Sequence, residues 1–178
     1  TNGLAYWNES MGPDSAEIIA YSFDYDESGT LDFDEIALYY VGCAGFPSMA
    51  TDAAGNMYVT YSAIMENFST GAQNYRQQFV VHSMDGGVTW NTEDACDLTP
   101  DIDFDGYEAV FGSMATDVVD GKLEIIYQRD FEPGLHVRGD LDPIYTNYIV
   151  HFRVPKDDLG DCADLGFEDA VGLEDEII

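Results

Sequence analysis

The chain has 178 residues, of which 46% are hydrophobic and 23% charged, a composition typical of one globular domain with a sizeable core. Its 35 acidic and 6 basic residues give a net charge of −29, which argues against nucleic acid and anionic membrane surfaces as partners. This charge suits an extracellular protein that meets cations, and it equally serves to keep a β-rich protein soluble. No stretch reaches the roughly 20 apolar residues of a membrane span, so direct membrane insertion is not expected. Aromatic residues (13%) and glycine-containing turns favour strands, and we predict an all-β fold.

The first 41 residues contain three stretches of alternating apolar and polar residues. Residues 3–7, 18–23 and 36–41 have this pattern, which is typical of strands in a sheet with one buried face. We therefore predict three strands here.

The acidic segment between the second and third of these strands fits the twelve-residue calcium loop of EF-hands. Gly29 stands at the sixth position, where the loop turns sharply. The alternation before the segment indicates a strand and not a helix, so the prediction is a calcium loop that bridges two strands. An ordinary acidic hairpin loop without a metal is the alternative. The predicted Ca²⁺ ligands are Asp24, Asp26, Ser28, Thr30, Asp32 and Glu35.

A repeat organises the rest of the chain. The segment Phe46–Asp52 recurs as Phe111–Asp117 with six of seven positions identical, and the two copies start 65 residues apart. Each copy is followed by a glycine turn, a second strand, a long polar loop and a third strand. The predicted strands are 48–52, 57–62 and 77–82 in one copy and 113–117, 122–128 and 145–153 in the other, with the polar loops at 64–75 and 129–143.

The N-terminal strands are interpreted as an earlier, incomplete copy. Residues 3–7 would be its second strand, and its first strand would lie before Thr1. The chain would then hold two full repeats and part of a third, with repeat boundaries near 45 and 110. Because an open sheet leaves unpaired edges, we expect other blades or another chain to cover them.

The segment Ser83-Met84-Asp85-Gly86-Gly87-Val88-Thr89-Trp90 matches the Asp-box, Ser-x-Asp-x-Gly-x-Thr-Trp. In a tight hairpin, Ser83 and Asp85 can bond backbone groups of the turn, and Gly86 and Gly87 accept a positive φ. Trp90 is expected to be buried over the hairpin. These residues are assigned a structural role.

With this motif, the chain resembles the sialidase-like (Asp-box or BNR repeat) β-propellers. The part from Phe46 to about Pro155 is similar to the C-terminal blades of secreted propellers from Bacteroidetes-type bacteria, in which segments like 125–130 and 132–140 recur. The resemblance implies a partial β-propeller over residues 1–160, a location outside the cell or on its outer surface, and export by type IX secretion. It also implies that 161–178 is an acidic tail or linker.

Catalysis by this chain is not predicted, although an enzyme is not excluded. Sialidases hold the substrate carboxylate with three arginines, and the four arginines here do not match that spacing. Tyr127 with Glu124 or Asp130 could form a catalytic group, but Tyr127 aligns with Tyr61 of the other repeat, which indicates a core position.

The remaining reactive residues form no recognisable site. The histidines are assigned to strands (His82 and His151) and to a loop (His136), and they lack the spacing of zinc ligands. A second acidic loop at 101–106 lacks a carboxylate at its twelfth position, so a surface loop is expected. The tripeptide 138–140 (Arg-Gly-Asp) is interpreted as a turn. The three cysteines are either buried thiols or one disulfide with one cysteine left over; they are Cys43, Cys96 and Cys162.

These observations predict a secreted or cell-surface, non-catalytic propeller module that binds a glycan or a protein through its long loops, or that joins the remaining blades of its own propeller. Two alternatives stay open. One is a fragment of an exo-sialidase-like glycoside hydrolase whose catalytic blades lie outside this chain. The other is a structural component of a surface assembly.

Overall fold

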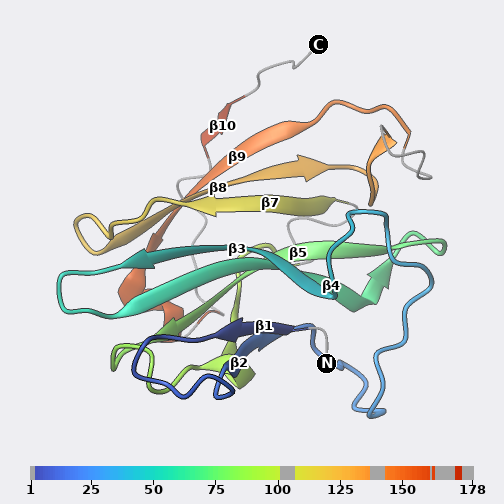
Figure 1. Ribbon diagram of the computed structural model, residues 1–178. Helices are drawn as coiled ribbons and strands as arrows, with labels where there is room; N and C mark the ends of the chain where they lie inside the picture. The colour runs from blue at the N-terminus through green and yellow to red at the C-terminus, as the bar shows by residue number, and fades with distance from the viewer. Residues whose placement is uncertain (1–2, 101–106, 137–142, 161, 163–170, 174–178) are drawn as a thin grey trace.

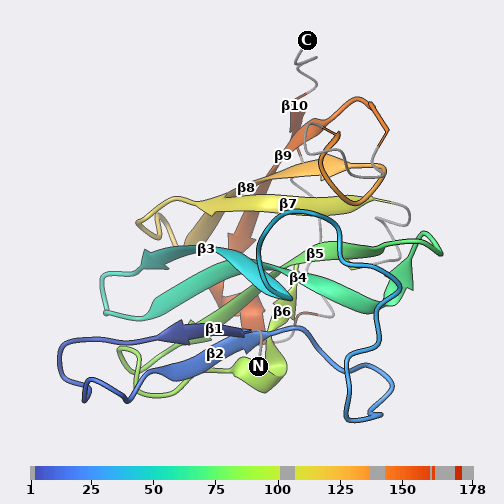
Figure 2. The ribbon, with the colours of Figure 1, turned by 45° about the vertical axis from the view of Figure 1, so that its right-hand side comes forward.

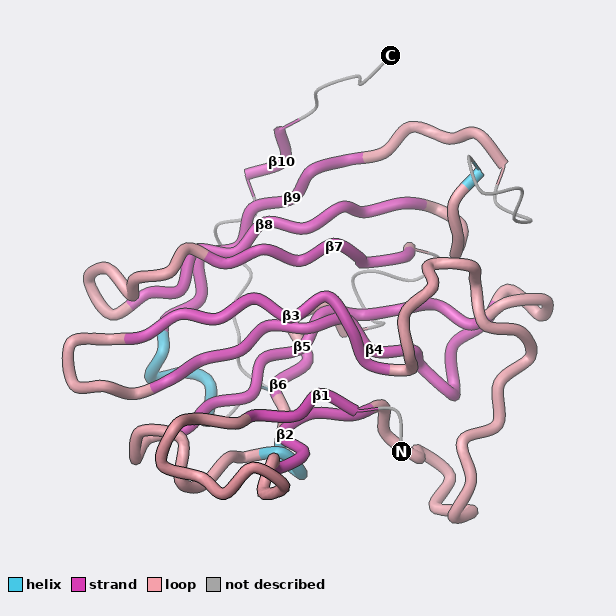
Figure 3. Tube along the Cα trace, in the orientation of Figure 1, coloured by secondary structure: helices cyan, strands magenta, loops and turns pink. Residues whose placement is uncertain are grey.

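The computed structural model describes residues 3–100, 107–136, 143–160, 162 and 171–173, and they form an all-β structure of three small antiparallel sheets (Figures 1 and 3). The only helical elements among these residues are short 3-10 turns, so the predicted all-β class is confirmed. No described helix is long and apolar enough to cross a membrane. The strands are β1 (Gly3–Tyr6), β2 (Glu17–Tyr21), β3 (Ala44–Thr51), β4 (Met57–Ser69), β5 (Asn74–Ser83), β6 (Cys96–Asp97), β7 (Glu108–Met114), β8 (Lys122–Asp130), β9 (Tyr148–Pro155) and β10 (Val171–Leu173), with 3-10 turns η1 (Thr92–Asp94) and η3 (Lys156–Gly160).

Two of the sheets have four strands each and the same internal order. In one, β3, β4, β5 and β6 pair in sequence, and in the other β7, β8, β9 and β10 do the same. Every pairing is antiparallel, so each sheet is a simple meander. The three consecutive strands predicted in each repeat are thereby confirmed.

Two of the predicted segments have a different structure. Residues 36–41 form no strand; they lie in an irregular segment that nevertheless buries Ala37 and Tyr39 against Val110 of β7. The polar loop predicted at 64–75 is mostly strand, because β4 continues to Ser69 and β5 starts at Asn74. The alternating apolar and polar pattern of a half-exposed strand does not apply to β4, because the residues of β4 from Tyr58 to Met65 are buried on both faces.

The other differences lie at strand ends. β7 runs over 108–114, earlier than the 113–117 predicted, and β9 begins at Tyr148 and not at 145. Residues 171–173, assigned to the tail from the sequence, form β10 and pair with β9. The acidic loop 101–106 and the tripeptide 138–140 lie outside the described residues.

The repeat also appears in the backbone. Phe46 and Phe111, which occupy the same repeat position, both have a positive φ (54° and 56°), and the pairing register of both strands shifts at that point. Their rings lie 4.9 Å apart, and the ring of Tyr39 meets both edge-on. A left-handed conformation is costly for phenylalanine, so the shared bulge must be fixed by its surroundings, here by this aromatic trio.

The two four-stranded sheets meet along their first strands, β3 and β7 (Figures 1 and 2). The Ser48 hydroxyl accepts a hydrogen bond from the Met114 amide (3.0 Å). At the strand ends, the Thr51 amide donates to the Thr116 carbonyl (3.0 Å) and the Val118 amide donates to the Thr51 carbonyl (3.1 Å). This parallel bridge and the Ser48 contact form what we call the β3–β7 seam.

The two-stranded sheet stacks on the other side of β3. Figures 1 and 2 show β1 beside β3, with the arrows of both strands pointing the same way. The assignment of residues 3–7 to the second strand of an incomplete repeat stays a prediction.

Two further links join the sheets. A disulfide connects Cys96 of β6 to Cys162, which follows η3, so one of the pairings left open by the sequence is settled. Cys43 is buried and is not part of that bond. The Lys156 ammonium lies 2.9 Å from the carboxylate of Asp52, at the turn between β3 and β4. Both links tie the end of the second four-stranded sheet to the first.

Candidate functional site

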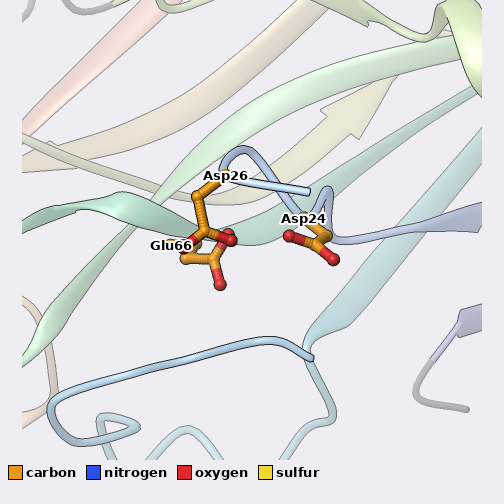
Figure 4. Close-up of side chains that lie close together, drawn as sticks. All are labelled: Asp24, Asp26 and Glu66. Atoms are coloured by element: carbon orange, nitrogen blue, oxygen red, sulfur yellow. The ribbon is translucent and has the colours of Figure 1, made fainter. Parts of the chain in front are cut away.

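The acidic segment after β2 folds against the far end of β4, and three carboxylates gather there (Figure 4). Asp24 and Asp26 come from the segment itself, and Glu66 comes from β4. One oxygen of each lies within 4.8 Å of the others, which is close enough for a single cation to contact all three. Carboxylate oxygens are the ligands that Ca²⁺ prefers.

Hydrogen bonds from the backbone fix the first two carboxylates. The Ser28 amide donates to Asp24 Oδ1 (3.1 Å) and to Asp26 Oδ1 (3.0 Å), and the Gly29 amide donates to Asp24 Oδ2 (2.7 Å). Gly29 has a φ of 87°, which an L-residue rarely adopts, so the glycine of the predicted loop is required for this turn. The bonds from Ser28 lower the pKa of Asp26 and favour its charged form.

Glu66 of β4 binds the backbone of the acidic loop at two points. Its two carboxylate oxygens accept the backbone amides of Tyr25 and Asp32, both at 2.8 Å. The sequence motif does not reveal this residue, because it stands on a separate strand more than thirty positions after the loop. The only signal is a carboxylate near the end of an otherwise apolar strand.

The other predicted ligands take different roles. The Ser28 hydroxyl donates to the Thr30 carbonyl (2.9 Å), and Asp32 contributes its backbone amide. The carbonyl of Glu35 accepts the amide of Asn74 (3.1 Å). Among the described residues, the carboxylates of Asp32 and Glu35 are not part of the three-carboxylate group. The structure thus joins two of the six predicted ligands to one carboxylate that was not predicted.

A second feature is an open hollow of about 320 Å³ where β8 ends and its following loop begins. It combines amide, carboxyl, imidazole and aromatic groups. Tyr145 is 49% exposed there and lies beside Phe131, with ring centroids 5.7 Å apart. The side chains that form the hollow include Gln128, Asp130, Leu135, His136, Tyr145 and Asn147.

A buried charged cluster lies next to the hollow. Glu108 of β7 pairs in register with Asp130 of β8, and one Glu108 carboxylate oxygen accepts the backbone amide of Arg76 from β5. The Arg76 guanidinium donates to the carbonyls of Gly42 (2.7 Å) and Cys43 (3.2 Å). The cluster therefore connects both four-stranded sheets to the segment before β3.

Burial dominates the protonation of this cluster. It raises the pKa of Glu108 to about 8 and also raises the pKa of Asp130, while it lowers the pKa of Arg76. All three directions show that removal from water outweighs the attraction between the charges. Carboxyl groups with raised pKa values beside an open hollow are a feature of functional sites, although structural clusters show it too.

The loop around the hollow is held by tyrosines from other elements. The Gly134 amide donates to the Tyr39 hydroxyl (2.9 Å), and the Tyr75 hydroxyl donates to the Phe131 carbonyl (3.1 Å). Burial raises the pKa of Tyr39, so its hydroxyl stays neutral. The hollow thus depends on residues 36–43 and on β5.

The remaining sequence candidates have structural positions. The Tyr127 side chain is buried in the core, as predicted, and burial raises its pKa. His151 lies on β9 and contacts Glu124 of β8 (2.6 Å). His82 lies on β5, where burial lowers its pKa. His136 lines the hollow.

The Ser83–Trp90 turn has the predicted local geometry. Asp85 Oδ1 accepts the Ser83 hydroxyl (2.8 Å) and the amides of Val88 (3.0 Å) and Thr89 (2.9 Å), and Gly86 and Gly87 both have a positive φ. Trp90 is half-buried, so the prediction that it is buried is only partly correct. Its ring packs on Tyr6 with centroids 5.2 Å apart.

The chain resembles known proteins only distantly. No protein-family model and no curated protein matches the chain. Among solved structures, the chain is similar to Zg3597, a family 117 glycoside hydrolase produced by the marine bacterium Zobellia galactanivorans, with 19% identity and a TM-score of 0.43. The match covers 77% of this chain and 40% of that one, so the chain spans less than half of the neighbour's length. A likeness this distant carries no argument about function.

The buried carboxyl group predicts a pH dependence of stability. Because the folded-state pKa of Glu108 is raised, folding favours its protonated form. That stabilisation is complete below the unfolded pKa of about 4.3 and is lost as the pH rises through about 8. We expect Glu108→Gln to remove this loss and to raise the unfolding free energy at pH 9, relative to the parent chain, by an amount on the order of a few kcal/mol.

Denaturant midpoints at both ends of this pH range would measure the effect. The control is Glu9→Gln, which removes the same charge from an exposed position. If Glu108→Gln and Glu9→Gln changed the pH dependence equally, overall charge and not burial would be the cause.

Proposed function

We propose that this chain is part of a β-propeller outside a bacterial cell, and that the assembled protein binds a glycan in the hollow at the end of β8. The propeller is supported by two sheets of identical strand order whose first strands lie side by side and parallel, with a third sheet stacked in the same direction. Each sheet would be one blade or part of one.

The side chains that line the hollow favour a glycan as its ligand. Sugars are commonly held by an aromatic face together with side chains that exchange hydrogen bonds with hydroxyl groups. Here Tyr145 offers the aromatic face, and Gln128, Asp130 and Asn147 offer polar groups in a space of about 320 Å³. The Gln128 amide also donates to the Asn147 side chain (2.5 Å), which fixes both.

The disulfide supports an extracellular location. Bonds such as Cys96–Cys162 persist in oxidising compartments and are rare in the cytosol of most organisms. The sequence resemblance adds export through type IX secretion to this proposal.

A second candidate, a fragment of a glycoside hydrolase, is favoured by one observation. Asp130 lines the hollow and its pKa is raised by burial, as a general acid requires. The other catalytic groups would then come from blades outside this chain. In a purely structural component of a surface assembly, by contrast, the hollow would bind no sugar.

Glycan binding to the chain itself tests the main proposal. We expect residues 1–178 to bind at least one member of a panel of uncharged and acidic oligosaccharides, as measured by calorimetry. Tyr145→Ala should weaken that binding about tenfold, because the aromatic face is lost. The matched control is Tyr25→Ala, which removes a tyrosine of similar exposure (43% against 49%) from the acidic loop. Failure to bind any member of the panel would contradict the proposal.

We also propose that Ca²⁺ binds Asp24, Asp26 and Glu66 and stabilises the loop between β2 and β3. Three neighbouring carboxylates on a chain of net charge −29 repel one another, and a divalent cation would remove that repulsion. A cation bound only by the folded chain adds about 2.7 kcal/mol of stability at a hundredfold excess over its Kd.

Calcium should therefore raise the Tm, and Glu66→Gln should abolish most of the increase. Glu35→Gln is the control, since the structure places Glu66 and not Glu35 in the carboxylate group. Thermal melts are compared in Ca²⁺ and in Na⁺ at equal ionic strength, because this surface responds to any cation. Identical melting curves would identify the loop as an ordinary acidic turn, and sensitivity to Glu35→Gln alone would restore the original motif assignment.

A further inference from the structure

The two copies of the heptapeptide place matching residues at matching positions in the two four-stranded sheets. In the first sheet Ser48 of β3 lies opposite Thr60 of β4, and in the second Ser113 of β7 lies opposite Ile126 of β8. The strand registers at the repeat are therefore the same in both sheets.

Burial differs between these matching faces. An alanine stands two residues after each serine and so points to the same face of its strand. Ala50 is 1% exposed and packs in the core between the two sheets, and Thr60 is buried as well. Ala115, at the matching position, is exposed, and Ile126 is 47% exposed. The face that the second sheet covers in the first copy is thus exposed in the second copy.

The backbone contacts of the β3–β7 seam have matching positions on this exposed face. In the seam, the Ser48 hydroxyl accepts the Met114 amide, and the Thr51 amide donates to the Thr116 carbonyl. Ser113 matches Ser48 and Thr116 matches Thr51, and both are exposed. A further sheet can form the same contacts there. We call this surface the outer face, and its side chains are Ser113, Ala115 and Ile126.

The β1–β2 sheet at the other end of the stack suits the outer face. β1, β3 and β7 run in the same direction, so the stack has two unlike ends (Figures 1 and 2). A second copy that continues the stack beyond β7 must therefore present its β1–β2 sheet. Ile18 of β2 is 41% exposed and alternates with Ile19, which packs in the core beside β4. Trp7, just after β1, is 50% exposed, so both ends of the stack carry exposed apolar side chains.

We propose that the outer face binds the β1–β2 sheet of a second copy, so that two copies join head to tail. This inference rests on the proposed propeller and names the partner that supplies its further sheets. Two chains of three sheets each make six, which lies in the range of about four to eight blades of closed propellers. A head-to-tail contact ends in a ring when the rotation between copies closes, so the expected product is a dimer.

Sedimentation of residues 1–178 over a range of concentrations tests the association. The net charge of −29 on each copy opposes the contact, and salt screens that repulsion. We expect a dimer with a Kd of roughly 10 μM at about 0.5 M salt, because contacts between small surfaces are weak, and a Kd about tenfold or more higher at about 0.05 M salt. At about 1 μM the chain is then mostly monomeric.

Variants that block one end each test the head-to-tail arrangement. Ala115→Arg and Ile126→Arg place a charge on the outer face, and Ile18→Arg places one on the β1–β2 sheet. Each variant alone should stay monomeric. A mixture of Ala115→Arg and Ile18→Arg should form a one-to-one complex, about tenfold or more weaker than the parent dimer, because one intact contact remains in place of two. The matched control is Ala53→Arg, an exposed position on the turn after β3, which should dimerise like the parent. The Tm of each variant checks its folding.

The outcomes separate this inference from the proposed function. A parent chain that stays monomeric at every concentration would overturn the inference, as would outer-face variants that dimerise like Ala53→Arg. A mixture without a complex, or growth of the parent chain beyond two copies, would overturn it too. A monomer that binds a sugar of the oligosaccharide panel would leave the proposed function standing, whereas a dimer that binds none would contradict that function and support the inference.

Discussion

The contact between β3 and β7 is the constraint on which the rest of the structure depends. Each strand begins one meander, and each carries the same bulge at a phenylalanine with a positive φ. The Ser48 hydroxyl of β3 accepts the Met114 amide of β7, and Thr51, three residues further along β3, adds backbone hydrogen bonds to Thr116 and Val118. Because these residues belong to the repeated heptapeptide, the repeat specifies the join between sheets as well as the strands. A sequence that repeats its joining residues can extend the same stacking to further sheets.

Both candidate sites lie where this stacking brings separate segments together. The three-carboxylate group combines the loop after β2 with β4, and the buried cluster beside the hollow joins Glu108, Arg76 and Tyr39 from three different elements. The segment from 24 to 43 takes part in both, since it carries the acidic loop at one end and Tyr39 at the other. Its irregular backbone is thus held by groups of the sheets, and the same segment contributes to both sites.

The sequence predicts the repeated part well and the connecting part poorly. The heptapeptide, the glycine turns and the Ser83–Trp90 turn follow from local patterns, and their geometry agrees with the prediction. Residues 36–41 alternate like a strand, yet they pair with none of the described strands and pack against Val110 of β7 as an irregular segment. Glu66 and the Glu108–Arg76 cluster escaped prediction because their partners are 34 and 32 residues away and become neighbours only through sheet pairing. The hollow likewise depends on tertiary contacts that no local pattern encodes.

The most direct measurement compares the two equivalent serines of the repeat. Ser48 forms the seam with Met114, whereas Ser113 occupies the same repeat position on β7, is exposed, and faces no further described sheet. If the seam holds the sheets together, Ser48→Ala should lower the free energy of unfolding by about 1–2 kcal/mol in denaturant titrations. Ser113→Ala should change it by less than about 0.5 kcal/mol. Equal losses from the two substitutions, or no loss from Ser48→Ala, would contradict the account.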